Sequence, residues 1–165
     1  MRACRSRGID GVVLDVECVR ARLPSGCVPA AVDAVLRFHA RGRLLGPRGL
    51  PTQEAIARTA GWTPETGTSF EGLVRALATF LPHPPDRVPL DDRRAVRSRL
   101  ERDRPIIVLV GTGAPVAGHA VVLSGLLDFS ATAPLAVVCD PVLHSGYRLL
   151  VDYKTLGACA LAGVA

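Results

Sequence analysis

Patterns typical of helices come first in this 165-residue sequence, and patterns typical of strands come second. Helical spacing of apolar residues runs from about residue 27 to residue 103, whereas short continuous apolar runs dominate from residue 105 onward. Short links join the strand patterns, as antiparallel neighbours allow. Helices in one half of the chain and strands in the other predict an α+β fold with an antiparallel sheet.

Capping residues and apolar periodicity give the expected bounds of each element. Thr52 is a suitable N-cap with Gly61 as the C-terminal stop, Thr68 and Glu71 fit a capping box, and Asp91 fits a third cap. The expected helices cover 27–41, 52–60, about 69–81 and 92–103, with a short helical tail at 152–157. The expected strands cover 105–110, 119–125, 135–139 and 147–151, with a strand or extended lead-in at 11–19; loops fill 42–51, 82–89 and 111–118.

The length and composition predict a single globular domain. At 48% hydrophobic and 21% charged residues, the chain has an ordinary globular composition and enough length for a real core. We expect residues 1–10 to be an N-terminal extension and residues 11–165 to be the domain. No apolar run reaches the length of a membrane span, and we see no signal peptide. Five scattered cysteines with no CxxC pair predict free thiols in the cytoplasm.

The net charge of +5 comes almost entirely from arginine, since Lys154 is the only lysine. Such a charge is compatible with nucleic-acid binding, which would show a steep dependence on salt. Acidic residues interleave with the basic ones, however, and no basic motif rich in aromatic residues is present. We therefore favour a solvated surface and do not expect a nucleic-acid partner.

The start of the first helix carries a thiol. Pro29 lacks an N–H and is tolerated only in the first turn of a helix, which places the helix start at about Gly26 to Cys27. A thiol in this position meets the positive end of the helix dipole and unpaired N–H donors, which favour the nucleophilic thiolate. A buried cysteine with no role is the alternative for Cys27 taken alone.

A histidine and a carboxylate occur where they can serve that thiol. His119 opens one expected strand and Asp140 closes the next, and adjacent antiparallel strands bring such positions to the same sheet edge. A base near a nucleophile, with a third group that orients the base, is the general arrangement for covalent catalysis. Taken singly, His119 and Asp140 have ordinary alternatives, as a satisfied histidine and as a strand terminator before Pro141.

Successive blocks of the sequence resemble bacterial papain-like cysteine peptidases, and in particular the group related to bacteriocin leader-processing (double-glycine) peptidases. The resemblance covers about residues 18–157. It implies Cys27 as nucleophile, His119 as general base and acid, and Asp140 as the orienting group, with no cofactor and no metal. The blocks that carry it are residues 26–31 (GCVPAA), 51–57 (PTQEAIA), 67–69 (GTS), 104–110 (RPIIVLV), 118–125 (GHAVVLSG) and 139–141 (CDP).

The chain departs from that family at one position. The family usually has a glutamine six residues before the cysteine, where its side chain donates to the oxyanion, but here Ala21 occupies the position. The only glutamine is Gln53, in a different expected helix. Arg22 or Ser25 could substitute, and the backbone N–H of Cys27 could still donate.

Two hypotheses of different classes follow. In the first, the chain is a papain-like hydrolase that cleaves an amide bond in a peptide or protein through a Cys27–His119–Asp140 triad. In the second, it is a catalytically impaired papain-fold module that binds a peptide or a partner protein in the same cleft. Ala21 is the feature that favours the second hypothesis.

Overall fold

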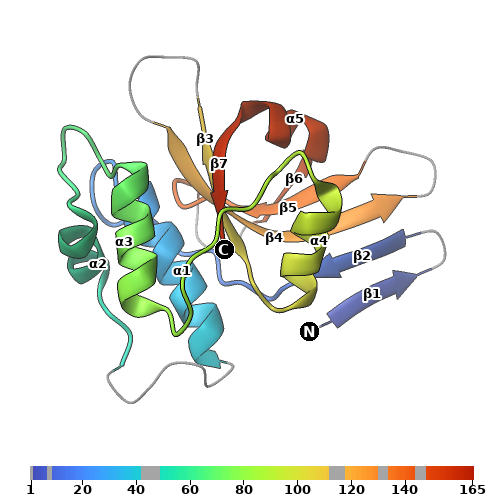
Figure 1. Ribbon diagram of the computed structural model, residues 1–165, viewed down its shortest axis with the longest axis horizontal. Coiled ribbons are helices and arrows are strands. Elements are labelled where there is room, and N and C mark those ends of the chain that lie inside the picture. Colours follow the sequence, from blue (N-terminus) through green and yellow to red (C-terminus); the bar gives the residue numbers. More distant parts are fainter. Residues whose placement is uncertain (1, 7–8, 42–48, 112–117, 130–133, 144–147) are drawn as a thin grey trace.

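The computed structural model describes residues 2–6, 9–41, 49–111, 118–129, 134–143 and 148–165. Three helices, α1 to α3, gather on one side, and the strands lie on the other side with α4 and α5 (Figure 1). The helices are α1 (Cys27–Arg41), α2 (Gln53–Ala60), α3 (Phe70–Phe80), α4 (Arg93–Glu101) and α5 (Tyr153–Cys159). The strands are β1 (Arg2–Ser6), β2 (Ile9–Val13), β3 (Ile106–Val110), β4 (His119–Phe129), β5 (Leu135–Cys139), β6 (Leu149–Asp152) and β7 (Ala160–Val164). None of the described helices is both long and apolar enough to span a membrane.

The seven strands form one sheet in which every pairing is antiparallel. The long strand β4 is the centre of this sheet. It pairs with β3 over its first half and with β2 over its second half, while β5 pairs across the middle. Because β5 overlaps both of the other partners in register, β2 and β3 lie along one edge of β4 and β5 lies along the opposite edge. The α+β architecture with an antiparallel sheet is confirmed.

Helix α1 joins the two halves of the molecule. Its apolar residues at helical spacing are buried and pack against β4 as well as against α2 and α3. Pro29 lies in the first turn, as predicted, because that turn needs no N–H from it. The helix starts at Cys27 and packs against β4, the strand that begins with His119.

Several predicted boundaries are confirmed and two caps are corrected. Thr52 caps α2 by accepting from the N–H of Ala55, and Gly61 ends it in the left-handed conformation. The cap of α3 is Ser69 and not Thr68, and the cap of α4 is Asp92 and not Asp91. In each case two neighbouring residues have equivalent capping chemistry, and the chain path decides which side chain reaches the open N–H groups.

The ends of the chain add strands that we did not expect. Residues 2–6 were expected in an N-terminal extension, but they form β1 and pair with β2 in the same sheet. The expected strand or lead-in at 11–19 splits into β2, which ends at Val13, and an extended segment behind it. At the other end, β7 follows α5 and pairs with β3. The domain boundary at residue 11 stays a prediction, and β1 lies on the extension side of it.

Parts of some predicted elements lie outside the described residues. This holds for most of the loop at 42–51 and of the loop at 111–118, and for the first residue of the strand expected at 147–151. The strand expected at 119–125 continues to Phe129 because its second half pairs with β2.

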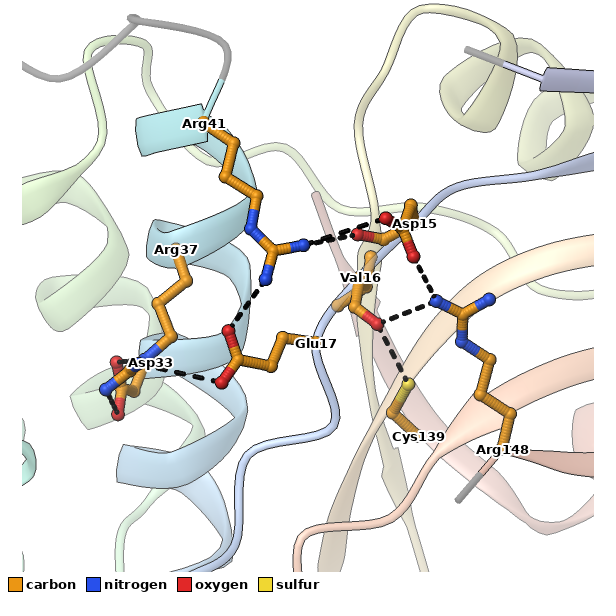
Figure 2. Close-up of polar contacts among 8 residues, drawn as sticks. All are labelled: Asp15, Val16, Glu17, Asp33, Arg37, Arg41, Cys139 and Arg148. Atoms are coloured by element: carbon orange, nitrogen blue, oxygen red, sulfur yellow. Dashed lines mark hydrogen bonds and ion pairs between the residues drawn. The ribbon is translucent and has the colours of Figure 1, made fainter. Parts of the chain in front are cut away.

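The extended segment that follows β2 in the sequence contacts both α1 and the sheet. Glu17 forms an ion pair with Arg41 of α1 (2.9 Å), and Asp15 forms one with Arg148 on the sheet side (2.7 Å) (Figure 2). The carbonyl of Val16 accepts from Arg148 at 3.1 Å and faces the thiol of Cys139. These contacts lead the chain along the junction of the two halves to the loop that precedes Cys27.

Candidate active site

The thiol of Cys27 lies in the first turn of α1, behind a tight turn at Gly26. The N–H of Gly26 donates to the carbonyl of Leu23 at 3.0 Å. A Cβ atom at residue 26 would lie 2.7 Å from that same oxygen, so the turn admits only glycine without a shift of the backbone. Cys27 is half-buried, which leaves its sulfur accessible at the helix N-terminus.

His119 and Asp140 meet at one edge of the sheet. His119 opens β4, and Asp140 directly follows β5, the neighbour of β4. The Nε2 atom of His119 lies 2.8 Å from Oδ1 of Asp140, and the same oxygen accepts from the N–H of Val142 at 2.8 Å. With Nε2 engaged by the carboxylate, the other ring nitrogen, Nδ1, is left for a second partner.

The second partner of His119 is the thiol of Cys27. Burial of Cys27 opposes its ionisation, but hydrogen bonds from His119 and from the N–H groups of Ala120 and Val28 outweigh it and lower the pKa of the thiol. The hydrogen bond with Cys27 in turn raises the pKa of His119, against burial and together with Asp140. Shifts in these opposite directions favour a thiolate–imidazolium pair.

The other described thiols have no such environment. Cys18 and Cys139 are free and buried, at 6% and 2% exposure. Burial, with a contribution from Cys18, raises the pKa of Cys139 to about 12. Cys4 lies in β1 and Cys159 ends α5, but their side chains are outside the described part of the structure. Within that part, only Cys27 combines access with a lowered pKa.

Cys27 and His119 face a single cleft of about 440 Å³ between the helices and the sheet. One wall is the loop before α1, and the facing residues come from the loop at 66–68 and from the ends of β4 and β5. The cleft is lined by Arg20, Ala21, Leu23, Ser25, Gly26, Cys27, Val28, Thr66, Gly67, Thr68, Gly118, His119, Pro141 and Val142. In the residues that the structure describes, no group of three metal-ligating side chains occurs.

Gln53 has a different role from the family's oxyanion donor. Its side chain is 2% exposed and bridges the backbone of the cleft wall: Oε1 accepts from the N–H of Arg22 and Nε2 donates to the carbonyl of Arg20, both at 3.0 Å. Nε2 also lies 3.3 Å from a carboxylate oxygen of the buried Asp33. Because both ends of the amide are engaged, Gln53 holds the wall and does not donate into the cleft.

Ser25 and Arg22, the two residues that could replace the family's glutamine as oxyanion donor, differ in their position relative to the cleft. The hydroxyl of Ser25 lines the cleft but donates to the carbonyl of Pro64 at 3.3 Å. Arg22 is exposed and is not among the lining residues, whereas Arg20, two positions earlier, is. The sequence did not indicate a role for Arg20 or Gln53 in the cleft. Nothing in the sequence shows that the side chain of Gln53 would bond the backbone of a loop more than 30 residues earlier.

Comparison with solved structures supports the fold. A double glycine motif protease from an AMS/PCAT transporter, crystallised in complex with the leader peptide, matches with a TM-score of 0.61 at 13% identity, over 93% of this chain and 91% of that one. A putative C39-like peptidase from Bacillus anthracis matches with a TM-score of 0.61 at 12% identity, over 94% and 98% of the two chains. The papain-like α+β fold expected from the sequence is thereby confirmed. No protein-family model matches the sequence, and no curated protein matches it either.

Proposed function

We propose that this protein is a papain-like cysteine hydrolase that cleaves an amide bond in a peptide or protein. The observation that carries the proposal is that Cys27, at a helix N-terminus, and His119, 2.8 Å from Asp140, face one cleft. The lowered pKa of Cys27 and the raised pKa of His119 support it. A solved protease of this fold holds a leader peptide, which supports a peptide as the occupant.

The reaction follows from the roles of these groups. The thiolate of Cys27 attacks the carbonyl carbon, and the negative charge moves to the oxygen, which the N–H of Cys27 stabilises. His119 then gives its proton to the amine as the carbon–nitrogen bond breaks, leaving a thioester on Cys27. Water, deprotonated by His119, attacks the thioester, and the acid product leaves as the thiolate re-forms. Asp140, whose Oδ1 lies 2.8 Å from Nε2 of His119, orients the imidazole.

The chemistry is consistent with the cytoplasm as the site of action. A nucleophilic thiol must stay reduced, and reducing compartments keep thiols free. Cys18, Cys27 and Cys139 are all free in the structure.

Alkylation of the thiols tests the proposal without knowledge of the substrate. An isolated thiol with a pKa of about 8.5 is less than about 1% ionised at pH 6, whereas a thiol paired with an imidazolium is reactive there. Limiting iodoacetamide at pH 6, followed by peptide mass mapping, should label Cys27 before Cys4. His119→Ala should abolish that preference and leave the labelling of Cys4 unchanged.

His83→Ala is the matched control, because His83 lies outside the cleft. It should leave the preference for Cys27 intact. Equal labelling of Cys27 and Cys4 in the native protein would refute the activated pair.

A peptide-binding module without turnover is the second candidate function. The observation that favours it is Ala21, which lines the cleft where the family has its donor, together with the full engagement of Gln53 elsewhere. In that case the Cys27→Ala protein would bind peptides as well as the native protein does, and no peptide would be cleaved by the native protein.

A further inference from the structure

The cleft has one permanent cation among its lining residues. Of its lining residues, only Arg20, Cys27 and His119 carry an ionisable side chain, and none is a carboxylate. The first turn of α1 contains no acidic residue to offset the positive end of the helix dipole. A substrate in this cleft therefore meets one permanent cation, Arg20, beside the thiolate–imidazolium pair.

Arg20 is also a cation with no counter-ion in the described part of the chain. Its side chain is exposed, and it forms no ion pair with any residue that the structure describes. Arg37, Arg41 and Arg148 each reach a carboxylate (Figure 2), whereas Arg22 and Arg102 are exposed and, like Arg20, form no ion pair with a described residue. What distinguishes Arg20 from Arg22 and Arg102 is its position, because Arg20 lines the same cleft as Cys27.

The backbone beneath Arg20 is fixed on both sides. Its carbonyl accepts from Nε2 of Gln53 at 3.0 Å, and the next N–H, that of Ala21, donates to the carbonyl of Pro141 at 2.8 Å. Arg20 therefore lines the cleft from a backbone that is held in place on both sides.

The carboxylates nearest in sequence are committed or lie outside the cleft. Glu17 is paired with Arg37 and Arg41 on the outer side of α1. Glu65 is exposed next to Thr66, but it is not among the lining residues. Asp140, next to the lining residue Pro141, has Oδ1 engaged by His119 and by the N–H of Val142 and forms no ion pair with Arg20. No described carboxylate is thus among the residues that line the cleft with Arg20.

We propose that Arg20 is a specificity-determining residue that binds a carboxylate of the substrate, so the cleft accepts acidic peptides. The carboxylate comes from an aspartate or glutamate side chain near the cleaved bond, or from a peptide C-terminus. A planar guanidinium suits either source, because it can donate two parallel hydrogen bonds to one carboxylate. The inference rests on the proposed function, and it names the substrate class of the same site.

A pair of small reagents measures the anion preference at the thiol directly. Iodoacetate and iodoacetamide differ by one carboxylate, so the ratio of their rates at Cys27 reports the local charge. A cavity of this volume is about 8 Å across if equidimensional. A unit charge at that distance changes the ratio by roughly 2-fold at the dielectric constant of water and by roughly 30-fold at an effective value of about 20, at low salt. Arg20→Ala should lower the ratio by a factor within this range, Arg20→Glu should lower it further, and Arg20→Lys should retain most of it.

Arg102→Ala is the matched control, because Arg102 is an exposed arginine at the end of α4 and does not line the cleft. It removes the same bulk charge and should leave the ratio unchanged. An unchanged ratio in Arg20→Ala, or an equal fall in Arg102→Ala, would overturn the inference.

Peptide libraries distinguish the two sources of the carboxylate. Pairs that differ by Glu against Gln at each position, and pairs that end in a free acid against an amide, are compared by kcat/KM in native and Arg20→Ala protein. Preference for Glu at one position, lost in Arg20→Ala, supports a side-chain carboxylate. Preference for the free C-terminus, lost in the same variant, supports the terminal one. A preference for Gln and amide peptides in the native protein would overturn the inference.

The reagent ratio separates this inference from the proposed function. Alkylation can be measured at pH 8.5 even for a thiol that is not activated, so the ratio has a value whether or not Cys27 is a nucleophile. Equal labelling of Cys27 and Cys4 at pH 6 would refute the hydrolase, whereas a ratio insensitive to Arg20 would refute the anion site alone.

Discussion

Replacing Gln53 by alanine should destabilise the protein far more than a typical helix substitution. The side chain makes two partly buried hydrogen bonds to the backbone of Arg20 and Arg22, and one buried bond to the carboxylate of Asp33. A typical hydrogen bond contributes about 1 kcal/mol, and one to a charged group about 1.5–3 kcal/mol. The sum predicts a loss of about 3–5 kcal/mol, against a total stability of roughly 5–15 kcal/mol for a natural domain.

Chemical unfolding, with thermal unfolding as a second measurement, tests this value. For a chain of this size a loss of 1 kcal/mol lowers Tm by about 2–4 °C, so Gln53→Ala should unfold at least several degrees below the native protein. Arg58→Ala is the control, since Arg58 is exposed on the same helix, and such surface changes usually stay within about 0.5 kcal/mol. Equal midpoints for the two variants would refute the reasoning, because Gln53 would then contribute no more than a solvated side chain.

Three further predictions concern the site and its surroundings. Asp140→Ala removes the hydrogen bond to His119 and should slow peptide cleavage roughly 10- to 100-fold, which is less than the effect of replacing His119 itself. Asp140→Asn keeps a hydrogen-bond acceptor and should slow cleavage less than Asp140→Ala does. An unchanged rate in Asp140→Ala would exclude Asp140 from the mechanism. Ala21→Gln places an amide donor in the cleft and should raise kcat by up to roughly 10²–10³. Ala21→Glu introduces a side chain of similar size without the amide donor and should not raise kcat. Equal kcat values for the two variants would contradict an oxyanion site beside residue 21. Burial and the neighbouring His83 lower the pKa of His39 from 6.5 to about 4. Between pH 6.5 and pH 4 the unfolded chain therefore binds more protons than the folded protein, and the free energy of unfolding should fall as the pH drops through this range. His39→Phe should make this fall smaller in urea titrations.

The sequence alone predicted the elements whose causes are local. A proline in the first turn fixed the start of α1 at Cys27, and Thr52 with Gly61 fixed both ends of α2. Continuous apolar runs predicted β3 and β5 because buried strands need apolar residues on both faces. The approach of His119 to Asp140 was predictable as well, since the start and the end of adjacent antiparallel strands share an edge. The catalytic roles of Cys27, His119 and Asp140 stay predictions.

The tertiary structure decided what depends on distant partners. Residues 2–6 and 160–164 carry no distinctive strand pattern, and they become β1 and β7 because β2 and β3 offer open edges for backbone pairing. A lone glutamine in a helix gives no sign of its target, so the hold of Gln53 on the cleft wall follows only from the packing of α2 against the loop before α1. The same folding leaves Arg20 at the cleft without a described counter-ion, because charge pairing depends on which side chains the fold brings together and not on their spacing in the chain.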